Sequence, residues 1–278
     1  MTMNDNTTVP SDGARTFDVR AFARTAQGSM RDEIDTTEYA EQRLPDDVLR
    51  VLRFLRDLEA STMAHLRNVL VTATHKDARV TAFLVSWAFE KFWIADAIEM
   101  VLEANGESGT AVATDGAAVR HDHVEAPDRR GPVMRAISAM RIGTPIVAVH
   151  MASGLIDEWI TRAAYERAVE VAHSEALTKT VARLLGLKQR HSEFFEEESR
   201  CRLASTPRAA KLANRTLGHV AWPLGSIGRS NETRAFFERF AFGGVEGAAR
   251  AGAIERGIAS LPGISAGVAR DIRERLVP

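Results

Sequence analysis

A lysine and a histidine share the apolar face of one amphipathic segment in the second half of the chain. In residues 184–198, apolar side chains recur at helical spacing around His191, and Lys188 lies three residues earlier on the same face. A charged side chain on a buried face costs several kcal/mol unless an opposite charge or a metal ion compensates it. The two residues therefore predict a polar site inside the fold.

Three glutamates lie in the same way on the apolar faces of three other predicted helices. Glu59 and Glu90 are equidistant from the break between their helices, THKDA at residues 74–78. Glu166 and His191 are equidistant from the stretch LTKT at residues 177–180. Antiparallel helices joined by a tight turn place such residues at one height. We therefore predict that Glu59, Glu90, Glu166 and His191 converge inside a four-helix bundle. The glutamates need positive partners, and the candidates are a metal ion, the ammonium of Lys188 or a protonated His191.

Four long amphipathic helices would position these residues. The first begins at Pro45 with two acidic residues in its first turn, and the second ends at Asn105-Gly106, a typical C-terminal signal. The third follows Pro145, and the fourth is the segment that carries the lysine and the histidine. Strand-like alternation is scarce, so we predict an all-α protein. The irregular stretch at residues 106–132 indicates a bundle with one long crossover.

The chain divides into three parts by composition. Residues 1–44 are polar, with scattered Pro, Gly and Ser, and we expect a flexible N-terminal arm there. Residues 45–204 hold the predicted bundle. Residues 205–278 hold shorter helical segments, which we expect to pack on the bundle as a C-terminal extension. The Ala/Gly-rich end of this extension permits close helix packing, so we expect it either to cover the bundle or to pair two chains as a homodimer.

Bulk composition argues against several classes of protein. The 278 residues are 45% hydrophobic, and 36 basic against 37 acidic side chains leave a net charge of −1. This balance gives no bulk attraction to nucleic acid or to an acidic membrane. There is no run of about 18 apolar residues that could form a membrane span. A single cysteine, Cys201, excludes an internal disulfide, and the N-terminus lacks the apolar core of a signal peptide, so we expect a cytoplasmic protein.

Three local strings resemble motifs of one known family. They are Tyr165-Glu166-Arg167-Ala168 with His173 downstream, Trp87-Ala88-Phe89-Glu90, and Arg190-His191-Ser192-Glu193-Phe194-Phe195. They are similar to the third-, second- and fourth-helix motifs of the acyl-carrier-protein desaturase branch of the ferritin-like di-iron carboxylate superfamily. That superfamily uses a Glu on each of two helices and a Glu-x-x-His on each of the other two. The resemblance covers about residues 52–198 and implies a ferritin-like bundle. The metal ligands that it implies are Glu59, Glu90, Glu166 and His191.

Two positions depart from the superfamily's pattern. The histidine expected three residues after Glu90 is Trp93, and the glutamate expected three residues before His191 is Lys188. An ammonium repels a divalent ion by about 4 kcal/mol per unit charge at about 4 Å and an effective dielectric constant of about 20. A di-iron centre is therefore disfavoured. Two options stay open: one iron or manganese ion on the remaining ligands, or no metal, with Lys188 and His191 neutralising the glutamates.

The resemblance leaves two functions open. We favour a non-catalytic or altered relative of the di-iron oxidoreductases, with a degenerate carboxylate/histidine metal site, kept as a binding or scaffolding protein. The alternative is a metal-dependent, oxygen-activating oxidoreductase of the desaturase or hydroxylase type. The resemblance implies an acyl chain or another small apolar molecule as the substrate of such an enzyme.

Overall fold

The structure, a computed structural model, describes residues 15–107, 143–226 and 229–278. Within these ranges the regular secondary structure is helical and there is no strand. The all-α class predicted from the sequence is therefore confirmed for the described part of the chain.

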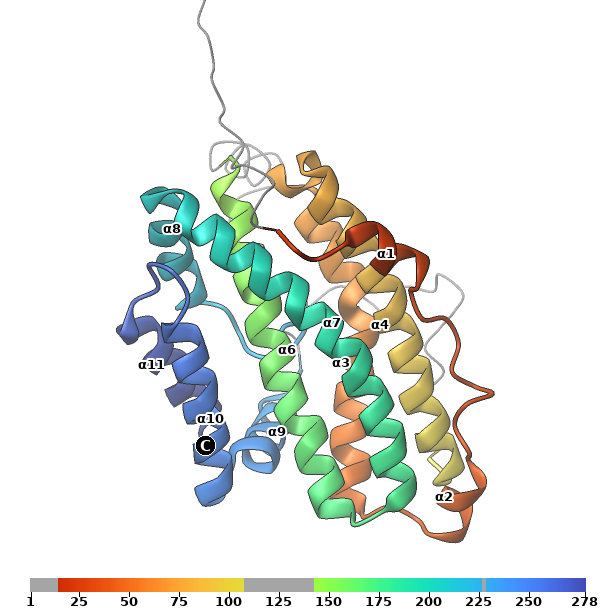
Figure 1. Ribbon diagram of the computed structural model, residues 1–278. Helices are drawn as coiled ribbons and strands as arrows, with labels where there is room; N and C mark the ends of the chain where they lie inside the picture. Colours follow the sequence, from red (N-terminus) through yellow and green to blue (C-terminus); the bar gives the residue numbers. More distant parts are fainter. Residues whose placement is uncertain (1–14, 108–142, 227–228) are drawn as a thin grey trace, which may run out of the picture.

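Four long helices run side by side and form the body of the molecule (Figure 1). They are α3 (Asp46–Leu70), α4 (Ala78–Ala104), α6 (Pro145–Ala172) and α7 (Glu175–Ser205). In Figure 1, α3 and α7 rise from the lower end of this bundle, and α4 and α6 descend from its upper end. Helices α4 and α6 run in the same direction, so the last residue of α4 and the first residue of α6 lie at opposite ends of the bundle. The predicted irregular stretch at 106–132 falls almost entirely outside the described residues.

Two turns set the heights at which residues of the bundle meet. A short 3-10 helix, η2 (Ala73–Lys76), separates α3 from α4, and Asp77 Oδ1 caps α4 by accepting a hydrogen bond from the Val80 N–H at 3.0 Å. Between α6 and α7, His173 takes a left-handed conformation with φ of 47°. Ser174 Oγ then accepts a hydrogen bond from the Leu177 N–H at 3.3 Å and caps α7. The second turn therefore lies several residues before the LTKT stretch where the sequence placed it.

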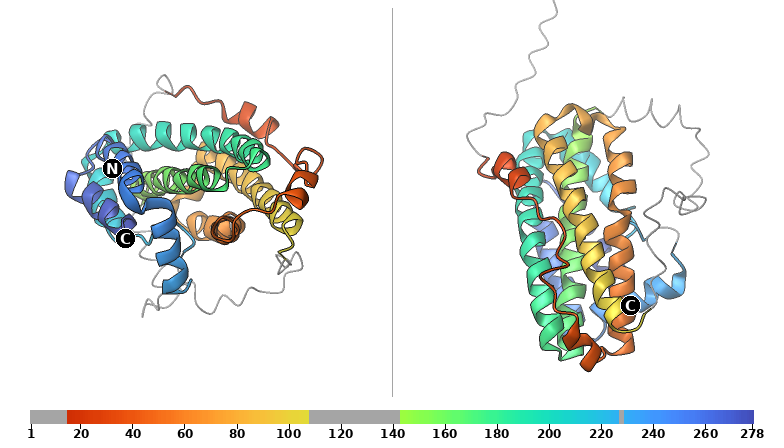
Figure 2. Two further views of the ribbon diagram at one scale, coloured as in Figure 1. Left: turned by 90° about the horizontal axis from the view of Figure 1, so that it is seen from below. Right: turned by 90° about the vertical axis from the view of Figure 1, so that its right-hand side faces the viewer.

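Helix α6 is the central helix of the fold. It packs against α3 and α7 on one side and against the C-terminal helices on the other, and the view along the bundle in Figure 2 shows it enclosed in this way. Its buried residues consequently lie around its whole circumference. An amphipathic pattern identifies a buried face only where the opposite face is polar. Because α6 is buried on all sides, its sequence does not indicate which side faces the bundle interior.

The N-terminal segment, residues 15–44, packs along the bundle, and the expectation of a flexible arm is wrong for this part. It contains α1 (Val19–Arg24) and α2 (Thr37–Glu41) and runs beside α4 and α7 (Figures 1 and 2). The backbone N–H groups of Thr16 and Phe17 both donate to Glu197 Oε2 on α7. Its buried apolar side chains follow one another at irregular gaps of three to eight residues and keep no single helical period along the segment: Val19, Phe22, Met30, Ile34, Tyr39 and Leu44. Periodicity therefore does not reveal them.

The residues after α7 form shorter helices that pack on the bundle. They are α8 (Pro207–Leu217), α9 (Asn231–Phe242), α10 (Gly244–Ala259) and α11 (Ala266–Leu276). Helices α8, α9 and α10 contact α6, and α9 also contacts α3. A Cβ atom at Gly257 of α10 would lie 2.9 Å from the Trp159 ring on α6, so close packing requires a glycine there. The Ala/Gly-rich end thus lies against the bundle, one of its two expected roles.

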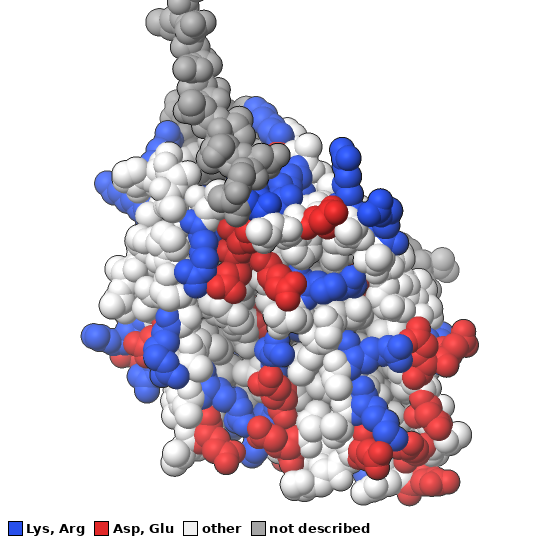
Figure 3. Space-filling model, in the orientation of Figure 1, with Lys and Arg blue, Asp and Glu red and all other residues white. Residues whose placement is uncertain are grey.

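Within the described ranges, no helix combines the length and the apolar character that crossing a bilayer demands. The face shown in Figure 3 has Lys and Arg interspersed with Asp and Glu, in keeping with the near-zero net charge.

Candidate functional site

Two lysines and two glutamates meet at the centre of the bundle, one from each long helix. Glu59 comes from α3, Lys91 from α4, Glu158 from α6 and Lys188 from α7, and each residue is at most 2% exposed. We call these four residues the lysine–glutamate cluster. Ionised groups at this depth are stable only when oppositely charged groups contact them directly.

Each lysine of the cluster bridges both glutamates. Lys91 Nζ lies 2.5 Å from Glu59 Oε2 and 3.2 Å from Glu158 Oε1. Lys188 Nζ lies 3.1 Å from Glu59 Oε1 and 2.6 Å from Glu158 Oε2. All four carboxylate oxygens are therefore in contact with an ammonium, and the cluster has no net charge.

Two neutral donors complete the cluster. The hydroxyl of Tyr165 donates to Glu59 Oε1 at 3.0 Å, and the indole N–H of Trp87 donates to Glu158 Oε1 at 3.1 Å. Burial and the adjacent Glu59 raise the pKa of Tyr165 well above its ordinary value, so the phenol keeps its proton and remains a donor.

The charges of the cluster stabilise one another. Burial alone would raise the pKa of Glu59 and of Glu158, but the ammonium groups of Lys188 and Lys91 outweigh burial. They hold the pKa of Glu59 below its usual range and that of Glu158 well below it. For Lys91, burial would lower the pKa, and Glu158 and Glu59 reverse this effect and raise it above the ordinary value of 10.5. The structure thus describes ammonium and carboxylate ions in a water-poor interior.

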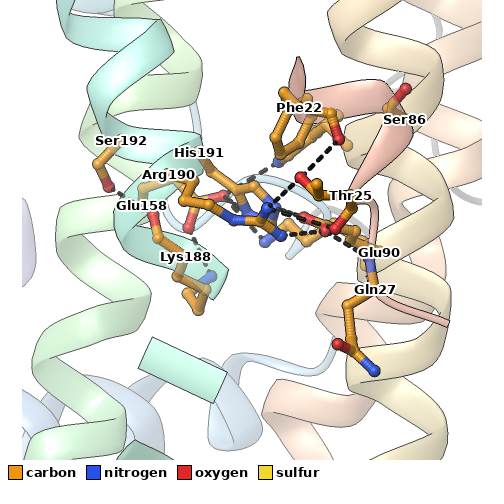
Figure 4. A network of polar contacts seen from close by, with 12 residues as sticks. Phe22, Thr25, Gln27, Ser86, Glu90, Glu158, Lys188, Arg190, His191 and Ser192 are labelled. Atoms are coloured by element: carbon orange, nitrogen blue, oxygen red, sulfur yellow. Dashed lines mark hydrogen bonds and ion pairs between the residues drawn. The ribbon is translucent and has the colours of Figure 1, made fainter. Parts of the chain in front are cut away.

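A third carboxylate, that of Glu90 on α4, is held beside the cluster by three donors (Figure 4). Its Oε1 accepts from the Gln27 backbone N–H at 2.7 Å and from Arg190, while its Oε2 lies 2.7 Å from His191 Nε2. The other ring nitrogen of His191 lies 3.6 Å from Glu158 Oε1, which connects Glu90 to the cluster. Phe22 of the N-terminal segment packs edge-on against the imidazole, with ring centroids 6.0 Å apart, and helps to bury it.

Most of the residues predicted from their apolar stripes do come together. Glu59, Glu90, Lys188 and His191 are all buried and linked by the contacts above. Glu166 is the exception, and its expected place in the interior is wrong. Its side chain is 45% exposed and pairs with Arg162 on the same helix at 3.0 Å.

The error at Glu166 follows from the turn and from the central place of α6. With the turn at residues 173–174, the positions of α6 that lie level with His191 and Lys188 are 156 and 159. Glu158 lies between these two positions. Placing the turn at LTKT shifts the partner by about ten residues. The apolar residues around Trp159 also favoured the wrong face, because that side of α6 packs against α10 and does not face the bundle interior.

Lys91 was not predicted as a site residue from the sequence, although it is adjacent to the predicted residue Glu90. Helix α4 buries a wide arc, so that the neighbouring Glu90 and Lys91 both point inward. A charged pair of opposite sign inside a long apolar helix is the pattern that could have indicated it.

The residues present do not fit a metal of the kind that the resemblance implies. No group of three or more His, Cys, Asp or Glu within the described ranges is arranged to hold an ion. A cation between Glu59 and Glu158 would lie beside two ammonium groups, each repelling a divalent ion by about 8 kcal/mol at about 4 Å and an effective dielectric constant of about 20. Glu90 in turn is engaged by Arg190 and His191.

A small cavity adjoins the cluster on its α3 side. Its volume is about 20 Å³, and its lining includes Glu59, Thr62, His65, Lys91 and Asp157. This is room for one water molecule and far too little for an organic substrate. Burial raises the pKa of Asp157 to about 7, although Lys91 opposes the shift, and its Oδ1 accepts a hydrogen bond from the Leu224 N–H at 2.7 Å.

Comparison with known proteins gives no further constraint on the site. No family model matches the chain, and no curated protein or solved structure matches it.

Proposed function

We propose that this chain is a non-catalytic, ferritin-like helical protein, a binding or scaffolding relative of the di-iron carboxylate oxidoreductases. In this proposal two lysines have taken the place of the metal. The observation that supports it best is the double bridge, in which Lys91 and Lys188 each contact both Glu59 and Glu158. The chain thereby supplies the positive charge that a metal would otherwise bring. A small apolar or acyl ligand and a homodimer, both expected from the sequence, are proposals that go with this function.

The cluster supports a structural role because it joins all four long helices at one level. Each ion pair spans two helices, so a shift of any helix along its neighbours would separate buried opposite charges. Buried polar networks of this kind can fix the register of packed helices. The cluster would accordingly hold the bundle in one arrangement while other surfaces of the protein bind.

The alternative function is a metal-dependent, oxygen-activating oxidoreductase acting on an acyl chain or another small organic molecule. It has the support of the sequence resemblance. The geometry favours it less, because the carboxylates already have ammonium partners and the adjoining cavity of about 20 Å³ leaves no room for such a substrate.

Metal analysis separates the two functions. The protein is purified without chelator, incubated with Fe(II) or Mn(II), passed through gel filtration and analysed for bound metal. The visible spectrum of the same sample is then recorded in air. The proposal predicts no stoichiometric metal, no charge-transfer band and no oxygen uptake.

Two matched glutamate variants locate any metal that does bind. Glu158→Gln alters the cluster, and Glu166→Gln alters an exposed glutamate of the same helix. One or two metals per chain that are lost in E158Q and kept in E166Q would overturn the proposal in favour of the oxidoreductase. The converse variant, Lys188→Glu, puts a carboxylate three residues before His191. It should acquire metal-dependent stability, because its surplus of buried carboxylates then needs a cation.

A further inference from the structure

The polarity of α4 is inverted relative to that of an ordinary surface helix. Between residues 80 and 95 its only charged side chains are Glu90 and Lys91, and both are buried. Its large exposed residues in the same stretch are apolar: Val85, Phe89 and Phe92, with exposed fractions of 54%, 45% and 40%. A surface helix in water places polar residues on its outer face. An apolar row with aromatic residues at its centre is instead typical of a face that another protein surface covers.

Helix α3 widens this apolar row into a patch. The contacts Glu59–Lys91 and Arg56–Glu99 fix the register of the antiparallel helices α3 and α4. That register places Met63, which is 50% exposed, level with the two phenylalanines of α4. Met63 lies two turns after Arg56 on the same row of α3, and this row borders α4. We call Met63, Val85, Phe89 and Phe92 the α4 patch.

Charges of opposite sign lie toward the two ends of the α4 patch. Glu103 is exposed and follows Phe89 by fourteen residues, so it shares the face of Phe89 toward the C-terminal end of α4. Asp96, seven residues after Phe89, is already paired with Arg31 of the N-terminal segment, so Glu103 carries the acidic charge of this end. The opposite end is basic, with the exposed residues Arg67 on α3 and Lys76 immediately before α4. Two copies of the patch are therefore complementary in charge when one copy is rotated by about 180° so that its acidic end meets the basic end of the other.

We propose that the α4 patch is the interface of a homodimer, in which two copies pack α4 against α4 in antiparallel fashion about a two-fold axis beside Phe89 and Phe92. Glu103 lies fourteen residues after Phe89 and Lys76 thirteen residues before it, so this axis brings Glu103 of one copy level with Lys76 of the other. A parallel arrangement would instead bring like charges together. The two-fold pairing is isologous, as in most homodimers, and buries each phenylalanine against its own equivalent. It does not depend on the metal content of the protein.

Sedimentation equilibrium of the full-length chain tests this interface. The wild type should sediment with twice the chain mass, and Phe89→Glu should weaken dimerisation by at least about 30-fold, as expected for the loss of a central aromatic contact. Phe89 is exposed, so the variant should keep its helical circular dichroism and its melting temperature. Val245→Glu on α10 is the matched control, because Val245 is 88% exposed and lies away from the patch, and it should dimerise as the wild type does.

Charge reversal tests the antiparallel geometry itself. The two-fold dimer contains the Glu103–Lys76 pair twice, so Glu103→Lys should weaken the dimer by up to about 30-fold, as expected for two exposed ion pairs, and the double variant K76E/E103K should restore it. A wild-type chain that stays monomeric at every concentration would overturn the proposal, as would a dimer that F89E leaves intact. A dimer that F89E breaks but that K76E/E103K does not restore would overturn the antiparallel arrangement.

Discussion

Replacing Lys188 by methionine should expose how strongly the lysine–glutamate cluster depends on its charge balance. Methionine approximates the unbranched stem of lysine, so the substitution chiefly removes the ammonium and opens little space. The variant loses the contacts to Glu158 at 2.6 Å and to Glu59 at 3.1 Å. Two buried carboxylates then share the single ammonium of Lys91.

The size of the effect follows from the burial of the partners. Removing one member of a buried ion pair typically costs about 3–5 kcal/mol, because the remaining charge stays in the interior without compensation. Both glutamates are 1% exposed, so water cannot take over the role of the lost ammonium. A second substitution, Glu158→Gln, removes the surplus negative charge, and the double variant should recover about 1–3 kcal/mol relative to the sum of the single effects.

Guanidinium unfolding followed by circular dichroism measures both quantities as changes in the free energy of unfolding. Lys179→Met is the matched control, because Lys179 lies on the same helix and pairs with Glu175 and Glu38 at the surface, and it should change stability little. A K188M loss no larger than that of K179M would refute the reasoning. If the change in unfolding free energy of the double variant equals the sum of the two single changes, the two charges do not act as a pair.

Two further predictions concern the pH dependence of stability. Asp157 has its pKa raised by burial from 3.8 to about 7, so the folded state holds the proton more tightly, and stability falls by about 4 kcal/mol as pH rises from 3.8 to 7. Asp157→Asn should remove this loss, and thermal melts that show the same slope for both proteins in that window would contradict it. His150, which lies 2.8 Å from Thr74 Oγ1, has its pKa lowered by burial, with His65 adding to the effect, from 6.5 to about 4. Its contribution is present above pH 6.5 and is lost, by about 3 kcal/mol, as pH falls to about 4. His150→Gln should flatten this acid limb, and an unchanged limb would assign the acid sensitivity to other groups.

The fold class and the four long helices could be predicted because hydrophobic periodicity and helix-end signals act locally. Pro45 and Asn105-Gly106 lie at helix ends that the structure places within a residue or two of the prediction. The packing of residues 15–44 could not be predicted in this way. Its buried residues are held by separate long-range contacts, such as that between Tyr39 and Thr180, and these leave no regular pattern in the sequence.

The interior of the bundle was predicted in part. The α3–α4 turn was located correctly, and this gave Glu59 and Glu90 their correct heights. The α6–α7 turn depends on His173 in a left-handed conformation, which a sequence without glycine at that point does not signal. The third acid was therefore assigned to Glu166 when the bundle uses Glu158. The ferritin-like relationship remains a prediction from the motif strings.

The protonation of Lys91 tests the central claim, that ammonium groups neutralise the interior carboxylates, most directly. Nitrogen-15 NMR of the lysine side chains, with the Lys91 signal assigned by its absence from Lys91→Met, follows this group as pH is raised. The structure predicts an ammonium whose hydrogens exchange slowly with water and which keeps its charge above pH 10.5, where surface lysines lose theirs. A Lys91 that is neutral below pH 10.5, or whose hydrogens exchange as fast as those of surface lysines, would contradict the account.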